Sequence, residues 1–130
     1  MVHSGIWEAL DRVITIEFRS AELNPGTLAA LYDAAREKLG GPVLQVAATR
    51  LDDVVKPGAS VVLTTGAGGP PWLFQGETDG PLGLAGLARA LSLGYGARPL
   101  VVTEARSVAP VTATLVAGGV SVLEDRKSVV

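Results

Sequence analysis

Two acidic residues, Glu77 and Asp79, stand one residue apart directly before a segment with helical spacing that begins at Pro81. A carboxylate can bind an ammonium group or act as a general base, so this pair could act on an amine. Asp79 or Gly80 is also expected to be the N-cap of the helix, where the helix dipole stabilises an acid. Asp79 therefore has a structural explanation, whereas Glu77 fits either a solvated loop position or a base in a binding site.

The residues ahead of this pair are typical of a site for a polar or anionic ligand. A β-branched run ends in Thr64 and Thr65, and Gly66 and Gly68 follow it at the start of a long Gly- and Pro-rich segment. Glycine adopts positive φ and lets a ligand approach backbone N–H groups closely. A strand, a glycine-rich loop and a helix N-terminus in this order bind anions at the edge of an α/β sheet. We therefore predict a functional loop over residues 66–80.

The same segment lacks two common nucleotide-binding motifs. It contains neither G-x-G-x-x-G nor a P-loop, because no lysine follows the glycines at the required spacing. Trp72, Leu73 and Phe74 argue against a merely flexible connection, since large apolar side chains need cover. They suit either a lid over the site or an interface patch.

Composition narrows the class of protein. Of the 130 residues, 48% are hydrophobic and 18% are charged, which predicts an ordered globular chain with a sizeable core. The net charge of −2, without a basic cluster, argues against a nucleic-acid partner. The chain has no cysteine and a single histidine, His3, which excludes thiolate and histidine-cluster metal sites. The sequence has neither an apolar run of membrane-spanning length nor signal-peptide features, so we expect a cytoplasmic protein with no membrane partner.

Apolar periodicity predicts three helices in the first half of the chain, over residues 6–18, 27–39 and 42–55. Ser4 is a candidate N-cap of the first, and Pro42 suits the first turn of the third. The third segment also has strand-like character, and its helical spacing decides the prediction. The faces expected to carry apolar side chains are Ile6, Leu10, Val13 and Ile14 in the first helix, and Leu28, Leu31, Ala35 and Leu39 in the second.

The second half of the chain alternates between strands and helices. Strands are predicted over residues 61–65, 100–103 and 120–123, and helices over residues 82–93 and 107–117. The inner face of helix 82–93 is expected to comprise Leu84, Leu87, Ala88 and Leu91. Continuous apolar strands joined by helical crossovers predict a small, mostly parallel sheet that is covered on both faces. The predicted fold is therefore α/β, a three-layer Rossmann-like arrangement with helices on both faces, in a single domain over residues 1–130.

Arginine side chains in or near the loops at the predicted sheet edge could hold a carboxylate. Glu104 and Arg106 follow the second strand at the edge where the glycine-rich segment leaves the first one, and Arg19 lies in a connection. Arg89 is expected to lie in solvent on the surface of helix 82–93.

Four sequence blocks, V-L-T-T-G, G-E-T-D-G-P-L-G, L-A-R-A-L and P-L-V-V-T, follow one another within residues 62–103. With the Gly/Pro-rich gap after the first block, they resemble the D-glutamate cyclase-like C-terminal domain family, formerly a domain of unknown function. The family signature is a strand, T-G-F-P, a spacer, E-T-D-G-P-x-G-A, a helix and a strand. A weaker similarity extends upstream over residues 14–63, where Arg19 corresponds loosely to the arginine of a family turn.

The sequence departs from the family pattern in two respects. T-G-A-G, residues 65–68, stands where the family has T-G-F-P, so the aromatic residue is absent or replaced by Trp72 or Phe74. The family domain is also longer, and its downstream E-R-x-G-R-x-x-D-G-x-Y-x-N and G-x-G-D-G-G-N-E blocks do not occur here. The resemblance thus covers roughly the N-terminal half of the family domain. The chain is then either a fragment, or a short relative that lacks half the site or takes it from a partner.

What the resemblance implies is a lyase that cyclises D-glutamate to 5-oxo-D-proline with loss of water and without a cofactor or metal. Glu77 or Asp79 would hold or deprotonate the ammonium group. The substrate-binding positions that it implies are Thr64, Thr65, Gly66, Gly68, Thr78, Gly80 and Arg19. The substrate's own chain brings the amine near the γ-carboxyl group, so the enzyme mainly has to fold it into a reactive shape.

Two further interpretations stay open. The chain could be a non-catalytic α/β module that binds a small anionic metabolite, or a subunit that completes its site by homo-oligomerisation. The missing downstream blocks favour the first interpretation. The apolar segments 72–74 and 120–122 suit the second.

Overall fold

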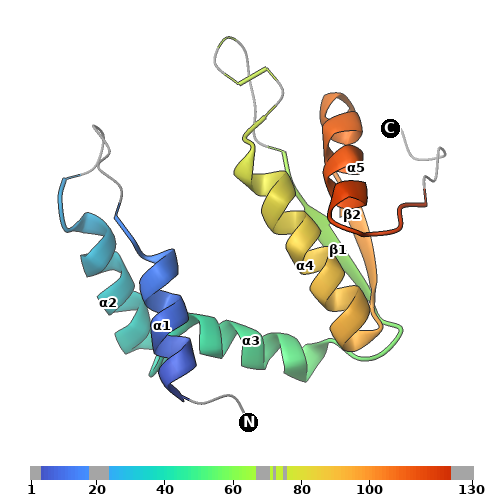
Figure 1. The fold of residues 1–130 in the computed structure, drawn as a ribbon. Coiled ribbons are helices and arrows are strands. Elements are labelled where there is room, and N and C mark those ends of the chain that lie inside the picture. Colours follow the sequence, from blue (N-terminus) through green and yellow to red (C-terminus); the bar gives the residue numbers. More distant parts are fainter. Residues whose placement is uncertain (1–3, 18–23, 67–70, 72, 75, 124–130) are drawn as a thin grey trace. The chain divides into compact units, whose positions relative to one another are not determined.

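The computed structural model describes residues 4–17, 24–66, 71, 73–74 and 76–123. These residues form three helices, then a strand, a helix, a strand, a short 3-10 turn and a last helix (Figure 1). The chain consists of two compact units, Met1–Val54 and Val55–Val130. The prediction of a single domain stays a prediction.

The first unit is helical and comprises α1 (Ser4–Ile14), α2 (Thr27–Leu39) and α3 (Val43–Val54). Both α1 and α2 pack against α3. The predicted bounds of α2 are confirmed, and α2 ends where Gly40 adopts φ 74°. Residues 43–54 are helical, as the spacing predicted, with Pro42 directly before the first turn. Ser4 lies inside α1 rather than at its cap, and α1 ends before the residue predicted, because its sequence becomes β-branched after Arg12.

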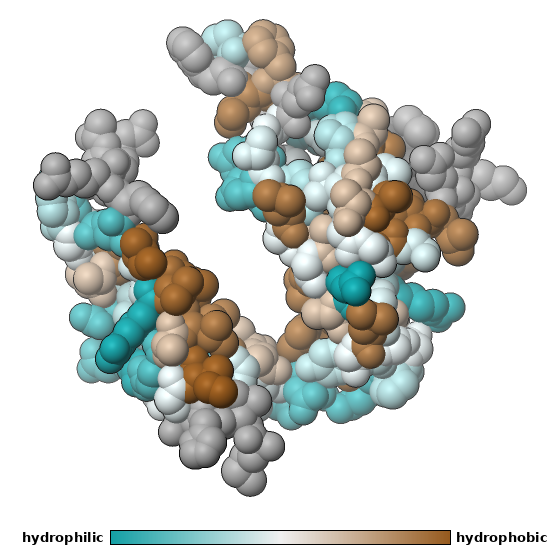
Figure 2. All heavy atoms as spheres, viewed as in Figure 1, coloured by the Kyte–Doolittle hydropathy of each residue, from teal (hydrophilic) through white to brown (hydrophobic). Residues whose placement is uncertain are grey.

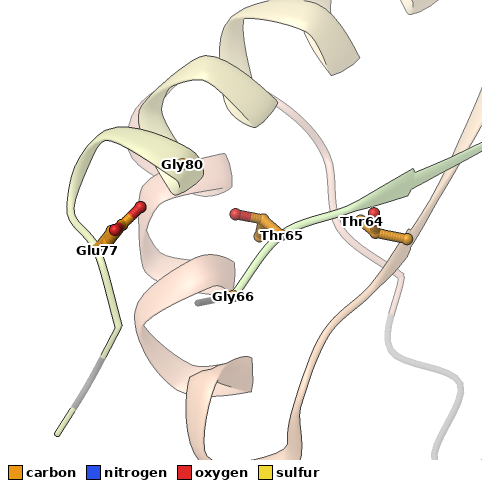
Figure 3. Close-up of a pocket in the computed structure, with 5 residues that line it drawn as sticks. All are labelled: Thr64, Thr65, Gly66, Glu77 and Gly80. Atoms are coloured by element: carbon orange, nitrogen blue, oxygen red, sulfur yellow. The ribbon is translucent and has the colours of Figure 1, made fainter. Parts of the chain in front are cut away.

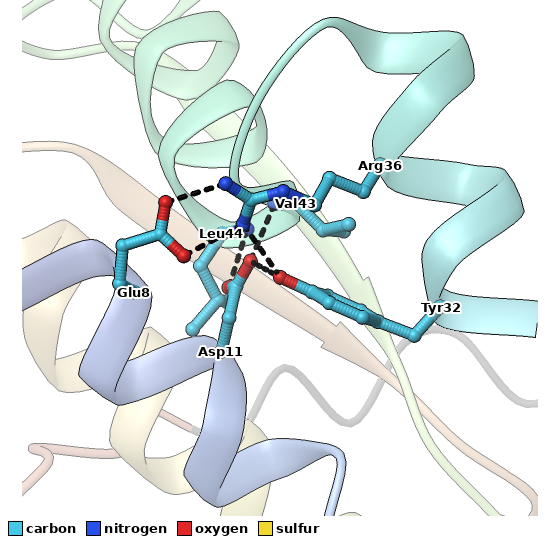
Figure 4. Close-up of polar contacts among 6 residues, drawn as sticks. All are labelled: Glu8, Asp11, Tyr32, Arg36, Val43 and Leu44. Carbon is cyan, nitrogen blue, oxygen red and sulfur yellow. Dashed lines mark hydrogen bonds and ion pairs between the residues drawn. The ribbon is translucent and has the colours of Figure 1, made fainter. Parts of the chain in front are cut away.

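Asp11 joins all three helices of this unit (Figure 4). Its side chain is fully buried and accepts a hydrogen bond of 2.7 Å from the Tyr32 hydroxyl of α2. It also accepts bonds of 2.7 and 3.0 Å from the backbone N–H groups of Val43 and Leu44. Asp11 therefore caps the N-terminus of α3 from another helix, a role that residues next to α3 would ordinarily fill.

The same polar cluster contains an ion pair between Glu8 of α1 and Arg36 of α2. The two guanidinium nitrogens Nη1 and Nη2 of Arg36 donate to the two carboxylate oxygens of Glu8, at 2.7 and 2.5 Å. Nη1 also donates to the Tyr32 hydroxyl, at 3.0 Å. The hydrogen bond from Arg36 lowers the pKa of Glu8 below its ordinary value. The cluster thus joins α1 to α2 through the ion pair between Glu8 and Arg36. It joins α1 to α3 through the hydrogen bonds of Asp11 to the N-terminus of α3.

The apolar face predicted for α1 is exposed in this structure. Ile6, Leu10, Val13 and Ile14 are 42–64% exposed. Figure 2 shows apolar side chains gathered along α1. The buried side of the helix carries Asp11 instead, because the cap of α3 and the bond to Tyr32 set the rotation of α1. In α2, Leu31 and Leu39 are likewise exposed rather than buried.

The second unit contains a two-stranded parallel sheet of β1 (Ser60–Thr64) and β2 (Arg98–Val102). They are joined through α4 (Asp79–Tyr95), and η1 (Ala105–Ser107) and α5 (Val108–Ala117) follow β2. The strand pairing places Thr64 opposite Val102, so both strands end at the same edge. Helix α4 packs on both strands and on α5. The buried apolar side chains of this unit are Val55, Leu63, Leu84, Ala85, Ala88, Leu91, Ala97, Val111 and Leu115.

The open face of the sheet differs from the prediction. Side chains on the strands alternate between covered and exposed, and Val62, Leu100 and Val102 are 50–61% exposed. Within the described residues, the structure is therefore a small α/β arrangement with a parallel sheet whose covered face packs on α4. The continuous apolar run in β1 is typical of a strand covered on both sides.

Some second-unit predictions are corrected. No strand forms over residues 120–123; the backbone N–H of Val120 bonds to the carbonyl of Leu115 instead, which continues the turn after α5. Helix α4 begins at Asp79, before the predicted residue 82. Leu87 is 42% exposed, and Ala85 is buried in its place. Pro110 lies in the first turn of α5, as predicted. None of the helices in the described part of the chain is long and apolar enough to cross a membrane.

Candidate functional site

A cavity of about 240 Å³ lies between the end of β1 and the start of α4. Five residues line it, Thr64, Thr65, Gly66, Glu77 and Gly80 (Figure 3). All five belong to the set that the sequence indicated. Pockets for drug-sized ligands have roughly 300–1,000 Å³, so this volume suits a small metabolite.

The strand–helix arrangement explains why residues far apart in sequence meet here. Because β1 and β2 are parallel, the chain must cross over through a helix, and α4 then starts at the edge where β1 ends. The first N–H groups of a helix have no partner within it, and the helix dipole favours negative charge at this end. Gly80, in the first turn of α4, brings its backbone to the cavity.

Thr65 lies directly against Gly80. A Cβ added at Gly80 would be 2.6 Å from the hydroxyl oxygen of Thr65, which is far closer than real contacts allow. Figure 3 shows the Thr65 hydroxyl and the Glu77 carboxylate pointing into the space beside Gly80. Glycine is therefore required at position 80 for the hydroxyl to reach the cavity.

Gly66 turns the chain out of β1 with φ 120°, a conformation that side chains other than glycine rarely adopt. A Cβ at this position would also be 3.0 Å from the hydroxyl oxygen of Thr103. That hydroxyl donates a hydrogen bond of 2.7 Å to the carbonyl of Thr65. Sequence reasoning missed Thr103 as a site residue, although its place at the end of the second predicted strand was the available signal.

Two predicted site residues lie outside the cavity lining. Asp79 is exposed and is the first residue of α4, so the proposed cap at Asp79 or Gly80 is wrong. Thr78 holds the N-cap position and makes no side-chain capping bond. An acid in the first turn is still stabilised by the helix dipole, which accounts for Asp79 without a catalytic role.

Other predicted site residues fall where the structure gives no description. Gly68, Arg19 and Trp72 lie outside the described residues. Leu73 and Phe74 are described and are 41% and 66% exposed. The predictions for Gly68 and Arg19 therefore stay predictions.

The charged residues near the sheet edge have partners outside the cavity lining. Glu104 and Arg106 follow β2 at the predicted edge and form an ion pair of 2.5 Å with each other. Arg89 is not simply solvated: its guanidinium donates to the carbonyls of Gly118 and Gly119, at 3.1 and 3.4 Å. A cation at this place stabilises the carbonyls at the end of α5.

The site therefore combines one carboxylate, two hydroxyl groups and the backbone of two glycines. Among the described residues that line the cavity, Glu77 is the one ionisable side chain. No group of three or more metal-ligating side chains was found in the described part of the chain. Such a set can accept a proton from an ammonium group and donate hydrogen bonds to a carboxylate or oxyanion.

Comparisons with protein-family models, with curated proteins and with solved structures found no match to this chain.

Proposed function

We propose that this protein is a lyase of the D-glutamate cyclase type, which converts D-glutamate to 5-oxo-D-proline and water. The observation that carries the proposal is the convergence of Glu77 with Thr65, Gly66 and Gly80 around one cavity. The similarity of the G-E-T-D-G-P-L-G block to the family signature supports the choice of substrate. A cavity of about 240 Å³ also suits a molecule of this size better than a nucleotide.

The proposed reaction needs proton transfers that one carboxylate can perform. Glu77 takes a proton from the ammonium group, and the freed amine attacks the γ-carboxyl carbon. The nitrogen loses a second proton when the ring closes. Both protons end on the departing γ-carboxyl oxygen, which leaves as water, so charge and atoms balance if Glu77 accepts and returns each proton in turn.

The backbone around the cavity suits the developing negative charge. When the amine attacks, charge accumulates on the γ-carboxyl oxygens, and fixed donors stabilise it without reorganisation. We assign this role to the N–H groups of Gly66 and Gly80, with the Thr64 and Thr65 hydroxyls as further donors. The positive end of the α4 dipole adds to the same effect.

The test is cyclisation of D-glutamate, followed by chiral chromatography with L-glutamate as control. We expect 5-oxo-D-proline from the D form alone. Glu77→Gln should lower kcat by about 10²- to 10⁴-fold, the usual contribution of a general base. Asp79→Asn is the matched control, because Asp79 does not line the cavity, and it should change kcat little. Equal losses in both variants would contradict the assignment of Glu77.

A second candidate function is binding of a small anionic metabolite without turnover. One observation favours it: the lining contains a single ionisable side chain, so no separate acid is at hand among the described lining residues. In that case D-glutamate or 5-oxoproline should raise the melting temperature while no product forms.

We extend the proposal to the fold and the assembly that the sequence indicated. A three-layer Rossmann-like arrangement requires cover over the sheet face that carries Val62, Leu100 and Val102. Homo-oligomerisation is one way to supply it. The cytoplasmic location expected from the sequence also stays part of the proposal.

A further inference from the structure

Thr103 makes a contact that the proposed reaction does not by itself explain. Its hydroxyl donates a 2.7 Å hydrogen bond to the carbonyl of Thr65, the last peptide before the chain turns at Gly66. The same oxygen lies over the Cα of Gly66, where a Cβ would be 3.0 Å away. The Thr103 hydroxyl, directly after β2, therefore lies at the edge of the Thr65–Gly66 peptide that carries the carbonyl group.

The geometry of this peptide fixes where its N–H group points. In a trans peptide the carbonyl and the N–H of the same unit point in opposite directions. The Thr65 carbonyl points toward Thr103, so the N–H of Gly66 points away from it. Gly66 lines the cavity, whereas Thr103 does not.

We propose that Thr103 is a positioning residue that holds the Gly66 N–H as a hydrogen-bond donor for a carboxylate bound in the cavity. The proposal rests on the cavity being a ligand site, as the proposed function requires. It assigns the orientation of the donor to a side chain directly after β2, which the cavity lining alone does not reveal.

A specific holding group is needed here because of the residue type. Glycine populates positive and negative φ with similar ease, so steric repulsion at residue 66 does not select one orientation of the preceding peptide. The Thr103 hydroxyl supplies that selection through one short bond. An oriented donor costs no reorganisation when the ligand binds, which is the source of its strength.

The experiment uses the whole chain labelled with ¹⁵N and follows the Gly66 amide signal during titrations with acetate and with D-glutamate. Thr103→Val removes the hydroxyl and keeps the shape of the side chain, whereas Thr103→Ser keeps the hydroxyl and removes the methyl group. Thr114→Val is the matched control, since Thr114 makes a similar bond of 2.8 Å to the Pro110 carbonyl within α5. Melting curves of all variants show whether the fold is kept.

In the unaltered chain, we expect the Gly66 amide to shift as acetate is added. Thr103→Val should weaken carboxylate binding about tenfold and abolish the Gly66 response, since one hydrogen bond to a charged group is lost. Thr103→Ser and Thr114→Val should behave like the unaltered chain. If Thr103→Val does not fold, Thr103→Ala takes its place: loss of the Gly66 response in that variant supports the proposal, and an unchanged response overturns it.

Failure of this inference and failure of the proposed function give different results. A Gly66 amide that stays unmoved by both probes in the unaltered chain, or an equal response in Thr103→Val, overturns the positioning role. A Gly66 amide that responds to acetate and loses its response in Thr103→Val, without cyclisation of D-glutamate, upholds the positioning role and rejects the lyase.

Discussion

At the scale of single residues, the cavity depends on two glycines, each for a different physical reason. Gly80 leaves room for the Thr65 hydroxyl, with which a Cβ would collide at 2.6 Å. Gly66 adopts φ 120°, which other residues reach only with strain. A substitution at the first should therefore affect the site, and one at the second the backbone.

Gly80→Ala is expected to weaken ligand binding without a large loss of stability. Alanine favours a helix over glycine by about 1 kcal/mol, so the melting temperature should not fall much. The added methyl group forces the Thr65 hydroxyl out of the cavity, and binding of D-glutamate should weaken about tenfold, measured by calorimetry. Gly83→Ala is the control, because a Cβ at Gly83 meets nothing within 4 Å. Equal affinity in the two variants would show that the hydroxyl is not part of the site.

Gly66→Ala should instead destabilise the chain by about 1–3 kcal/mol, the usual cost of a strained backbone conformation. The alanine Cβ would also press on the Thr103 hydroxyl. Denaturant unfolding measures the change. An unchanged unfolding midpoint would mean that the turn at Gly66 relaxes without strain.

At the scale of elements, the helical unit depends on a cap that is distant in sequence. Asp11 in α1 satisfies the N–H groups of Val43 and Leu44 at the start of α3. Burial raises the pKa of Asp11, but the hydrogen bonds from Tyr32 and from these N–H groups outweigh it and hold the pKa below its ordinary value. The ionised carboxylate is thus the form that the folded unit prefers.

This preference gives the unit an acid-sensitive stability. Because the folded pKa lies below the unfolded one, the stabilisation is complete above the unfolded value of 3.8 and is lost as the pH falls through the folded value. We expect α-helical circular dichroism to melt at lower temperature below about pH 4. Asp11→Asn should lower the melting temperature at neutral pH and make it less dependent on pH. Asp33→Asn, at an exposed position of α2, should do neither. An unaltered pH profile in Asp11→Asn would contradict the capping role.

At the scale of the whole molecule, exposed apolar side chains occur in both compact units. Val62, Leu100 and Val102 lie on the open sheet face, and the predicted inner residues of α1 are exposed as well. Contiguous apolar surface on a soluble chain commonly marks an interaction site.

We expect the chain to self-associate in solution, as the sequence suggested. Light scattering after size-exclusion chromatography should give a mass above the 13.3 kDa of one chain. Leu100→Thr would reduce association if the sheet face takes part, and it leaves the cavity lining intact. A monomer at all protein concentrations would remove oligomerisation from the proposal.

The sequence by itself determined most elements of this protein and the members of its cavity. Local spacing places α2 and α3, and Gly40 ends α2, because these signals act within one helix. The order strand, glycines and helix N-terminus brought Thr65, Gly66 and Glu77 together, because a parallel crossover leaves few alternatives.

The tertiary structure decided what depends on contacts between distant segments. It chose which face of α1 is buried, through the bonds of Asp11 to Tyr32 and to the start of α3. It left residues 120–123 outside the sheet, because an apolar run becomes a strand only when a neighbour pairs with it. It also placed Thr103 against Gly66, a contact set by strand register rather than by any local pattern.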